Sequence, residues 1–358
     1  MKLSHGWRKL LTAFLLCAVA LMALGQEVMS DHAVTEGKVV VYGTTDQRLV
    51  AALVADFESQ HPGVRVEYHD MNSSEIYQRF LEESAKGTSA DVLWSSAMDL
   101  QVKLVNDGYA QHHQSAETAV MPNWAVWRNE AFGTTYEPIV IVYNKKRLPP
   151  EDVPATHKAL IQLLKVNPSR FGGKVVTYDP RQSGLGYLLH TQDANTNGAI
   201  FWDLISTLGA SQARVDTSTG AMMDKIATGE ALIAYNLLGS YAHGLRHRDD
   251  SIGIVMPKDY TLVVSRVAFV ARKAPHPHAA HLWLDYLLSR RGQQMIASTA
   301  ELFAIREDVR GETTAAGLKA ALGGALKPIS IGPALLTYLD QAKRSNFLAQ
   351  WESVLSNK

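Results

Sequence analysis

The sequence predicts an α/β protein of two lobes, because apolar strands alternate with helical segments and four strands run into short polar loops. These four segments are VVVYGTTD (39–46), DVLWSSAMD (91–99), VVTYDPRQSG (175–184) and ALIAYNLLGSY (231–241). Each loop opens a helix, where unpaired N–H groups and the helix dipole supply roughly half a positive charge. Because open α/β sheets hold ligands beyond the carboxyl ends of their strands, we expect one small-molecule site between the lobes.

The first 25 residues are typical of a secretory signal peptide. Lys2, Arg8 and Lys9 precede an apolar run at 10–24, and Ala-Leu-Gly at 23–25 offers small residues for cleavage. The run holds about 15 apolar residues, whereas a membrane-spanning helix needs roughly 20. We therefore expect cleavage of this segment and export to the periplasm.

Cysteine usage and charge limit the class of the mature protein. Cys17 is the only cysteine and lies inside the signal run, after two leucines that do not fit a lipoprotein site, so neither disulfides nor thiolate metal sites are expected. The 35 basic and 35 acidic residues give no net charge, and no basic stripe suggests nucleic-acid binding. The remaining chain, about 330 residues, is long enough for two cores.

The first lobe is expected to begin with a strand at 38–42 and a helix at 47–60. The next expected elements are a strand at 64–68, a helix opened by Asn72 or Ser73 and stopped by Gly87, a strand at 92–94, and a helix opened by SSAMD and closed by Gly108. This alternation predicts a parallel sheet with crossover helices.

The segment 138–143 is expected to be a long buried strand that crosses to the second lobe. The expected elements of that lobe are the strand 174–178, the helix after Ser183, the helix 198–208, the helix after Ser218, and the strands 232–235 and 251–256. The apolar run 262–271 then returns the chain to the first lobe, and the helix after Pro277 is expected to break at Gly292.

Domain boundaries follow from these crossings. We assign 37–137 and 266–325 to lobe 1 and 138–265 to lobe 2, with hinge strands near 138–143 and 262–271. The helical segment 326–358 is not assigned to either lobe.

Several segments resemble the periplasmic solute-binding proteins of ABC importers, in the group that includes ferric-iron, phosphosugar and phosphonate binders. They are KVVVYGTTD, HPGVRVEY, SADVLWSS, YEPIVIVYNKKRLP, GEALIAYN and HPHAAHLWLDYLLSRRGQQMIAS. The resemblance covers nearly all of the mature chain. It implies the two-lobed periplasmic-binding-protein fold with hinge strands crossing between lobes, closure on a ligand, and delivery to an inner-membrane permease.

The ligand class is predicted from the strand-end residues. The ferric branch of this family has an acid or histidine after the first strand, a glutamate after the SADV strand, and a tyrosine pair after the GE strand. Here those places hold Thr44-Thr45-Asp46, Ser95-Ser96 and 237–241 without a tyrosine pair. A trivalent cation prefers several anionic oxygens, so ferric iron is the alternative and an oxyanion is the expected ligand.

The expected ligand shell combines hydroxyls, amides and one guanidinium. It consists of Thr44, Thr45, Asp46, Ser95, Ser96, Tyr136, Arg181, Ser183, Gly184, Asn236, Ser240 and Tyr241. In this shell Arg181 neutralises the ligand, so replacing it with alanine is expected to weaken binding. Tyr136 and Tyr178 are expected to pack on the carbon skeleton of the ligand.

Each assignment has a structural alternative. Asp46 and the hydroxyl residues at helix starts are also favoured there as plain N-caps. Arg181 has Asp179 and Asp193 as alternative partners. Arg266 either lines the cleft from a hinge strand or forms a structural ion pair.

Metal and enzyme classes are not favoured. Of thirteen histidines, only His243 and His247 have the i, i+4 spacing of a helical metal pair, and no HExxH motif accompanies them. The sequence contains no GxSxG, P-loop or GxGxxG motif, so a periplasmic hydrolase is the least favoured class.

The expected protein is an exported monomer without a cofactor. It captures a small organic oxyanion such as a phosphorylated sugar, a phosphoglycerate-like acid or a phosphonate. Its partner is an ABC permease or, as the alternative, a membrane sensor kinase.

Overall fold

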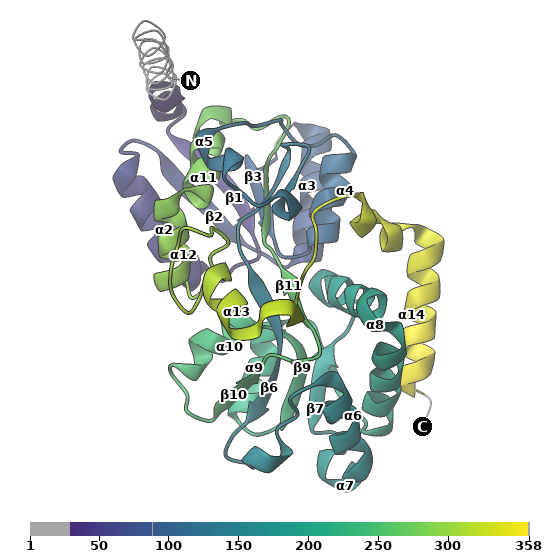
Figure 1. Ribbon diagram of the computed structural model, residues 1–358. Coiled ribbons are helices and arrows are strands. Elements are labelled where there is room, and N and C mark those ends of the chain that lie inside the picture. Colours follow the sequence, from purple (N-terminus) through teal and green to yellow (C-terminus); the bar gives the residue numbers. More distant parts are fainter. Residues whose placement is uncertain (1–28, 88, 357–358) are drawn as a thin grey trace, which may run out of the picture.

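The computed structural model describes residues 29–87 and 89–356 (Figure 1). Its described part contains two β-sheets, one above the other in this view, each covered by helices. The predicted α/β architecture with two lobes is thereby confirmed. The predicted signal peptide, including Cys17, lies outside the described residues.

The first sheet has the strand order β2-β1-β3-β12-β5-β4, in which β1 pairs in parallel with β2 and β3. Its strands are β1 (Lys38–Gly43), β2 (Arg65–Asp70), β3 (Val92–Ser95), β4 (Val126–Trp127), β5 (Ala131–Gly133) and β12 (Val267–Val270). The helices of this lobe are α2 (Gln47–Gln60), α3 (Ser73–Lys86), α4 (Met98–Asn106), α5 (Ala116–Ala119), α11 (Pro277–Leu288), α12 (Arg290–Ser298) and α13 (Ala315–Leu322).

The second sheet has the order β13-β11-β6-β9-β7-β8, with β10 also paired to β6. Its strands are β6 (Glu137–Asn144), β7 (Val175–Tyr178), β8 (Arg214–Asp216), β9 (Ile233–Leu238), β10 (Ile252–Val255), β11 (Thr261–Val264) and β13 (Leu326–Pro328). The helices around it are α6 (His157–Val166), α7 (Pro168–Phe171), α8 (Gly184–Ala210), α9 (Thr219–Ala227) and α10 (Gly239–Arg246). Short 3₁₀ turns are η1 (Asn123–Ala125), η2 (Pro150–Asp152), η3 (Gly323–Ala325) and η4 (Pro333–Leu339).

The chain crosses between the sheets at 134–136, at 265–266 and a third time before β13. The predicted strand 262–271 is therefore two strands, β11 in one sheet and β12 in the other, interrupted at Ser265 and Arg266. The crossings pack closely, since a Cβ on Gly133 would lie 2.6 Å from the hydroxyl of Ser265. This close approach explains why glycine ends β5.

Local sequence signals explain several helix boundaries. Asn72 caps α3 by accepting a hydrogen bond from the amide of Glu75, and Gly87 ends the helix in the left-handed conformation at φ 75°. The predicted break at Gly292 is wrong, because the chain turns at Ser289, which is extended and caps α12. Gly292 instead lies inside α12, where a Cβ would come within 1.9 Å of the carbonyl oxygen of Tyr286.

The two helices predicted after Ser183 and at 198–208 are both present within α8. They are separated at Asn197, whose backbone is not helical at φ −155° and ψ 80°. The polar sequence NTNG at this break favours a local turn over a continuous helix.

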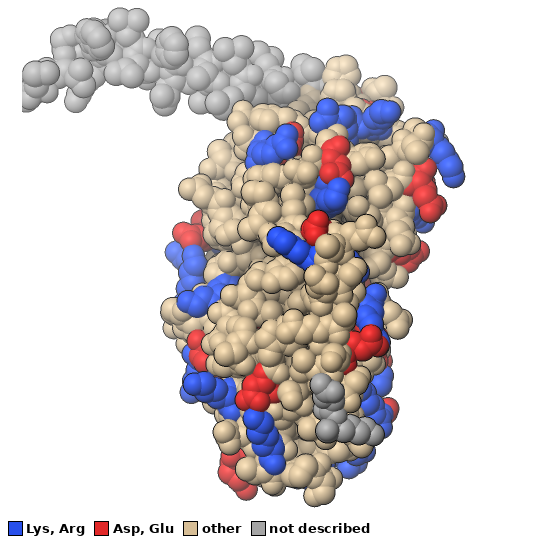
Figure 2. Space-filling view, turned by 90° about the vertical axis from the view of Figure 1, so that its right-hand side faces the viewer, with Lys and Arg blue, Asp and Glu red and all other residues tan. Residues whose placement is uncertain are grey.

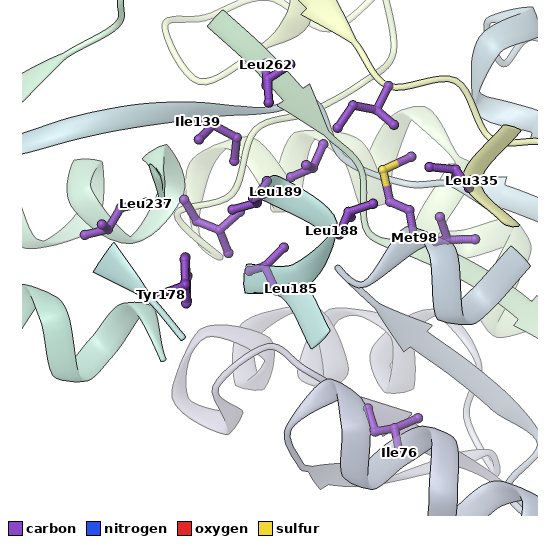
Figure 3. Packing of buried hydrophobic residues seen from close by; sticks show 14 of the residues in the cluster. Ile76, Met98, Ile139, Tyr178, Leu185, Leu188, Leu189, Leu237, Leu262 and Leu335 are labelled. Carbon is purple, nitrogen blue, oxygen red and sulfur yellow. The ribbon is translucent and has the colours of Figure 1, made fainter. Parts of the chain in front are cut away.

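The C-terminal segment contacts elements of both sheets. Helix α14 (Gln341–Ser356) packs along α8 through the buried Phe347 and Trp351. The preceding turn η4 packs on α4, and Figure 3 shows its Leu335 beside Met98 of α4. This segment therefore spans the two lobes on one side of the molecule. Among residues 29–87 and 89–356, no helix has the length and apolar character needed to cross a membrane.

Two glycines of α8 offer a matched test of how α14 docks. A Cβ on Gly209 would lie 2.1 Å from the carbonyl oxygen of Leu355 in α14, whereas nothing lies within 4 Å of one on Gly198. We expect Gly209→Ala to lower the free energy of unfolding by about 1–3 kcal/mol through overpacking. Gly198→Ala should be neutral or slightly stabilising. Urea unfolding of both variants measures this, and equal stabilities would contradict the α14 contact.

Candidate functional site

A cleft of about 550 Å³ lies between the two lobes at the strand ends that the sequence singled out. Its lining residues are Thr44, Asp46, Asp70, Met71, Asn72, Ser73, Ser96, Tyr178, Gln182, Ser183, Gly184, Leu185, Thr217, Ser218, Thr219, Gly220, Leu238 and Tyr241. They come from the loops after β1, β2 and β3 in one lobe and after β7, β8 and β9 in the other. No lysine or arginine is among the described residues that line it.

Six helices, α2, α3, α4, α8, α9 and α10, begin at this cleft. In three of them a side chain caps the third amide only: Asn72 in α3, Ser183 in α8 and Ser218 in α9. Five amides at these starts have no hydrogen-bond acceptor within the described part of the chain, namely those of Ser73, Gly184, Leu185, Thr219 and Gly220. The cleft is therefore lined by unpaired backbone N–H groups from both lobes.

Asp46 connects the lobes instead of capping α2. Its Oδ1 accepts a hydrogen bond of 2.5 Å from the hydroxyl of Tyr241 in α10. The first amide of α2, at Gln47, donates to Asp70 at 3.1 Å. Burial raises the pKa of Tyr241 above its usual range, and the neighbouring Asp46 carboxylate adds to this, so the phenol stays protonated and donates. The plain-cap interpretation of the Asp46 side chain is therefore wrong.

A second contact between the lobes lies at the start of α8. A Cβ on Gly184 would be 2.7 Å from the hydroxyl of Ser73 in α3 and 3.1 Å from Leu100 in α4. Only a residue without a side chain fits there without displacing its neighbours. The two lobes are therefore in contact at Gly184 of α8 as well as at Tyr241 of α10.

A buried ion pair lies behind the cleft, where the chain crosses between the sheets. Arg266 and Glu137 are both 0% exposed, and Nε of the arginine is 2.8 Å from the carboxylate. Nη1 of Arg266 donates to the hydroxyl of Thr44 at 3.2 Å, and the hydroxyl of Ser240 donates to Glu137. Burial lowers the pKa of Arg266, but Glu137 together with Tyr241 and Tyr68 outweighs this effect, and the net shift is upward. Of the two alternatives for Arg266, the structure shows the ion pair.

Six of the twelve predicted shell residues line the cleft and six do not. Those that line it are Thr44, Asp46, Ser96, Ser183, Gly184 and Tyr241. Those that lie elsewhere are Thr45, Ser95, Tyr136, Arg181, Asn236 and Ser240.

The guanidinium of Arg181 forms its hydrogen bonds with residues outside the cleft. Its Nε and Nη2 donate to the two oxygens of Asp179 at 2.9 and 2.8 Å, and its Nη1 donates to Glu352 of α14 at 2.7 Å. The predicted role in neutralising a ligand is not supported by this placement. A carboxylate two residues earlier in the same loop provides the bidentate partner that the ligand was expected to provide.

Adjacent predicted residues separate because neighbouring side chains at a strand end point in opposite directions. Thr44 and Ser96 face the cleft. Thr45 is fully buried beneath Tyr68, whose hydroxyl donates to its carbonyl, and Ser95 is buried and accepts from the amide of Ala97.

The other three residues are also buried. Tyr136 packs edge-on against Trp124 with ring centroids 5.6 Å apart, and Ser240 is bonded to Glu137. Asn236 has a left-handed backbone at φ 70°, and its buried side-chain nitrogen has no partner among the described residues.

Two loops that sequence reasoning missed contribute to the cleft. The loop after β2 supplies Asp70 to Ser73, and the loop after β8 supplies Thr217 to Gly220. Both have the same pattern as the four predicted loops, polar residues between a strand end and a helix start. The strand β8 has only three residues, Arg214–Asp216, so its periodicity gave no signal.

The described residues contain no group of three or more histidine, cysteine, aspartate or glutamate side chains arranged to hold a metal ion. His243 lies in α10 and His247 is its C-cap residue; their Nε2 atoms are 3.0 Å apart, and neither residue lines the cleft. Burial raises the pKa of Asp70, and the negative charge of Asp46 raises it further.

Comparisons with known proteins match this architecture. A family model described as bacterial extracellular solute-binding protein matches residues 38–299. The structure of the substrate-binding protein of an ABC transporter from Agrobacterium tumefaciens is 38% identical, covering 89% of this chain and 94% of that chain with a TM-score of 0.85. A search of curated proteins gave no match.

Two more distant structures show the same fold. AfuA from Actinobacillus pleuropneumoniae, with fructose-6-phosphate bound, is 16% identical over 90% of this chain and 99% of that chain, with a TM-score of 0.74. Iron-bound HitA from Pseudomonas aeruginosa is 20% identical over 88% and 99%, with a TM-score of 0.66. From the family match and the 38% identity along most of its length, the chain belongs to the bacterial extracellular solute-binding proteins.

Proposed function

We propose that this protein binds a small organic oxyanion that also carries hydroxyl groups, such as a phosphorylated sugar, a phosphoglycerate-like acid or a phosphonate. The proposal rests on five backbone amides at the starts of α3, α8 and α9, on both sides of one cleft. None of the five has a hydrogen-bond acceptor among the described residues. Helix starts bind phosphate and carboxylate groups through such amides and the helix dipole. The proposed ligand shell is Thr44, Asp46, Ser96, Ser183, Gly184 and Tyr241, together with Asp70 and Ser73.

The two carboxylates in the cleft favour a ligand with hydroxyl donors. Asp46 and Asp70 line it without a lysine or arginine among the described lining residues. These carboxylates would repel an inorganic anion, whereas sugar hydroxyls would donate hydrogen bonds to them. Acidic and basic side chains are interspersed over the face seen in Figure 2, so selectivity for an anion is assigned to the cleft itself.

Ferric iron is the less favoured ligand. Burial raises the pKa of both Tyr178 and Tyr241, the two cleft tyrosines, which opposes the phenolate form that a ferric ion prefers. Asp46 and Asp70 alone are a small anionic set for a trivalent ion. The iron-bound relative HitA shares the fold at 20% identity, which carries no ligand assignment to this chain.

Delivery to an ABC permease in the inner membrane completes the proposal. The Agrobacterium protein, 38% identical, is described as the substrate-binding protein of an ABC transporter. The segment at 1–25, typical of a signal peptide, supports export to the periplasm.

Calorimetric titration tests the ligand class. The mature protein, freed of co-purified ligand by unfolding and refolding, is titrated with fructose 6-phosphate, fructose, inorganic phosphate and ferric citrate. We expect the sugar phosphate to bind at least tenfold more tightly than fructose or phosphate, because only it uses both amides and carboxylates. Equal affinity for fructose, or tightest binding of ferric citrate, would contradict the proposal. Native mass spectrometry of the protein before refolding identifies any ligand acquired in the cell.

Gly184→Ala tests the closed arrangement of the cleft. The added Cβ would press on Ser73 and Leu100 of the other lobe, so it strains the closed form and leaves the separate lobes unchanged. We expect the dissociation constant of the ligand identified above to rise by about 5- to 30-fold, which corresponds to roughly 1–2 kcal/mol. Gly198→Ala in the same helix is the control and should bind like wild type. Unchanged affinity for Gly184→Ala would show that the lobes do not meet there.

Arg181→Ala tests whether the loop arginine contributes charge to the ligand. Because its guanidinium is held by Asp179 and Glu352 outside the cleft, we expect the dissociation constant to change by less than about twofold, or roughly 0.4 kcal/mol. A loss of affinity of tenfold or more would return Arg181 to the ligand shell.

A further inference from the structure

A second compartment lies beside the cleft and has no role in the proposed function. Its volume is about 250 Å³, and it is lined by Ser74, Tyr77, Gln78, Asp99, Leu100, Lys103, Gly184, Tyr187, Leu339 and Arg344. These residues come from α3 and α4 of one lobe, from α8 of the other, and from the C-terminal segment. Gly184 lines both spaces, and its contact with Ser73 lies between them. A space of this volume can hold a small metabolite as well as water.

The compartment contains a buried carboxyl group that forms no ion pair with a described residue. Asp99 is 3% exposed, and its Oδ1 accepts one hydrogen bond, from the amide of Leu100 at 2.9 Å. Within the described ranges, no lysine, arginine or histidine forms an ion pair with it, and no hydrogen bond reaches its Oδ2. A buried carboxylate is strongly disfavoured until a partner compensates its charge. Burial raises the pKa of Asp99 to about 7, although the nearby positive charge of Arg344 acts in the opposite direction without forming an ion pair.

The compartment also contains a cation that forms no ion pair with a described residue. The guanidinium of Arg344, from α14, lies 4.3 Å from the ring centroid of Tyr187, and the described residues give it no carboxylate partner. Lys103, the other cation of the lining, is already paired with Asp107. The compartment therefore presents one unpaired carboxyl and one unpaired guanidinium to the same small space.

We propose that this compartment is a binding site for a small zwitterion, with the ammonium group on Asp99 and the carboxylate on Arg344. An α- or ω-amino acid has this chemistry. An amine alone would leave Arg344 without an anion, and a carboxylate alone would leave Asp99 without a cation. Because the lining comes from both lobes and the C-terminal segment, the occupant binds the arrangement in which the lobes meet.

Isothermal titration at pH 8 with a set of probes tests this site. The zwitterions are glycine, 3-aminopropionate and 4-aminobutyrate, and the single-charge probes are propylamine and propionate. We expect at least one zwitterion to bind tenfold or more tightly than either single-charge probe. Asp99→Asn and Arg344→Met should each weaken it at least tenfold, whereas Lys343→Met, a neighbour outside the compartment, should not change it. Thermal unfolding shows whether each variant is folded before titration.

The pH dependence separates the zwitterion from a simple anion. The other titratable groups around Asp99 are Tyr77, Lys103, Tyr187 and Arg344, and burial raises the pKa of both tyrosines. Binding of the zwitterion should tighten from pH 6 to pH 8, because Asp99 gains its charge in this range. Three results would overturn the proposal: no zwitterion binding at 10 mM, propionate binding as tightly with an affinity that rises at low pH, or unchanged affinity in Asp99→Asn.

Discussion

The Arg266–Glu137 ion pair is the interaction on which the arrangement of the cleft depends. Both side chains are fully buried, and they lie at two of the connections between the sheets: Glu137 begins β6, and Arg266 lies between β11 and β12. Removing one partner of such a pair leaves an uncompensated buried charge, which costs about 3–5 kcal/mol. The pair also bonds Thr44 in one cleft wall and Ser240 beside the other, so both walls are positioned from one point.

Because Arg266 lies behind the cleft, the hydrogen-bond donors that line the cleft are neutral. An arginine in the lining would attract any anion, whereas fixed amides at the starts of α3, α8 and α9 require an oxyanion of the right shape. Such amides belong to rigid helices and lose little conformational entropy on binding. Asp46 and Asp70 add acceptors for hydroxyl groups. In the proposed function, this arrangement favours an oxyanion that also carries hydroxyl groups.

Sequence reasoning predicted most of the fold because strand and helix periods, caps and glycine stops are local properties; the helix at 47–60 and the Asn72 cap of α3 are examples. It failed where a strand end or a side-chain orientation depends on residues that are distant in the sequence. The break at Ser265 and Arg266 depends on packing with the other crossing, and the orientation of Arg181 depends on Asp179 and on Glu352 of α14. In the candidate site, the strand-end rule identified four of the six loops that line the cleft, but only the structure distinguishes Thr44 from Thr45.

Closure of the cleft and recognition of the ligand use the same residue. Asp46 accepts the Tyr241 hydroxyl through Oδ1, and its Oδ2 accepts no hydrogen bond from the described residues, so a ligand hydroxyl has an oxygen available. In an open form, Asp46 would lose Tyr241 and the ligand would lose the amides of the opposite lobe. A ligand shifts the equilibrium between open and closed forms only by its difference in affinity for them. In the proposed function, an oxyanion that also donates to Asp46 would gain contacts from both lobes only in the closed form, and this difference in affinity would shift the equilibrium toward closure.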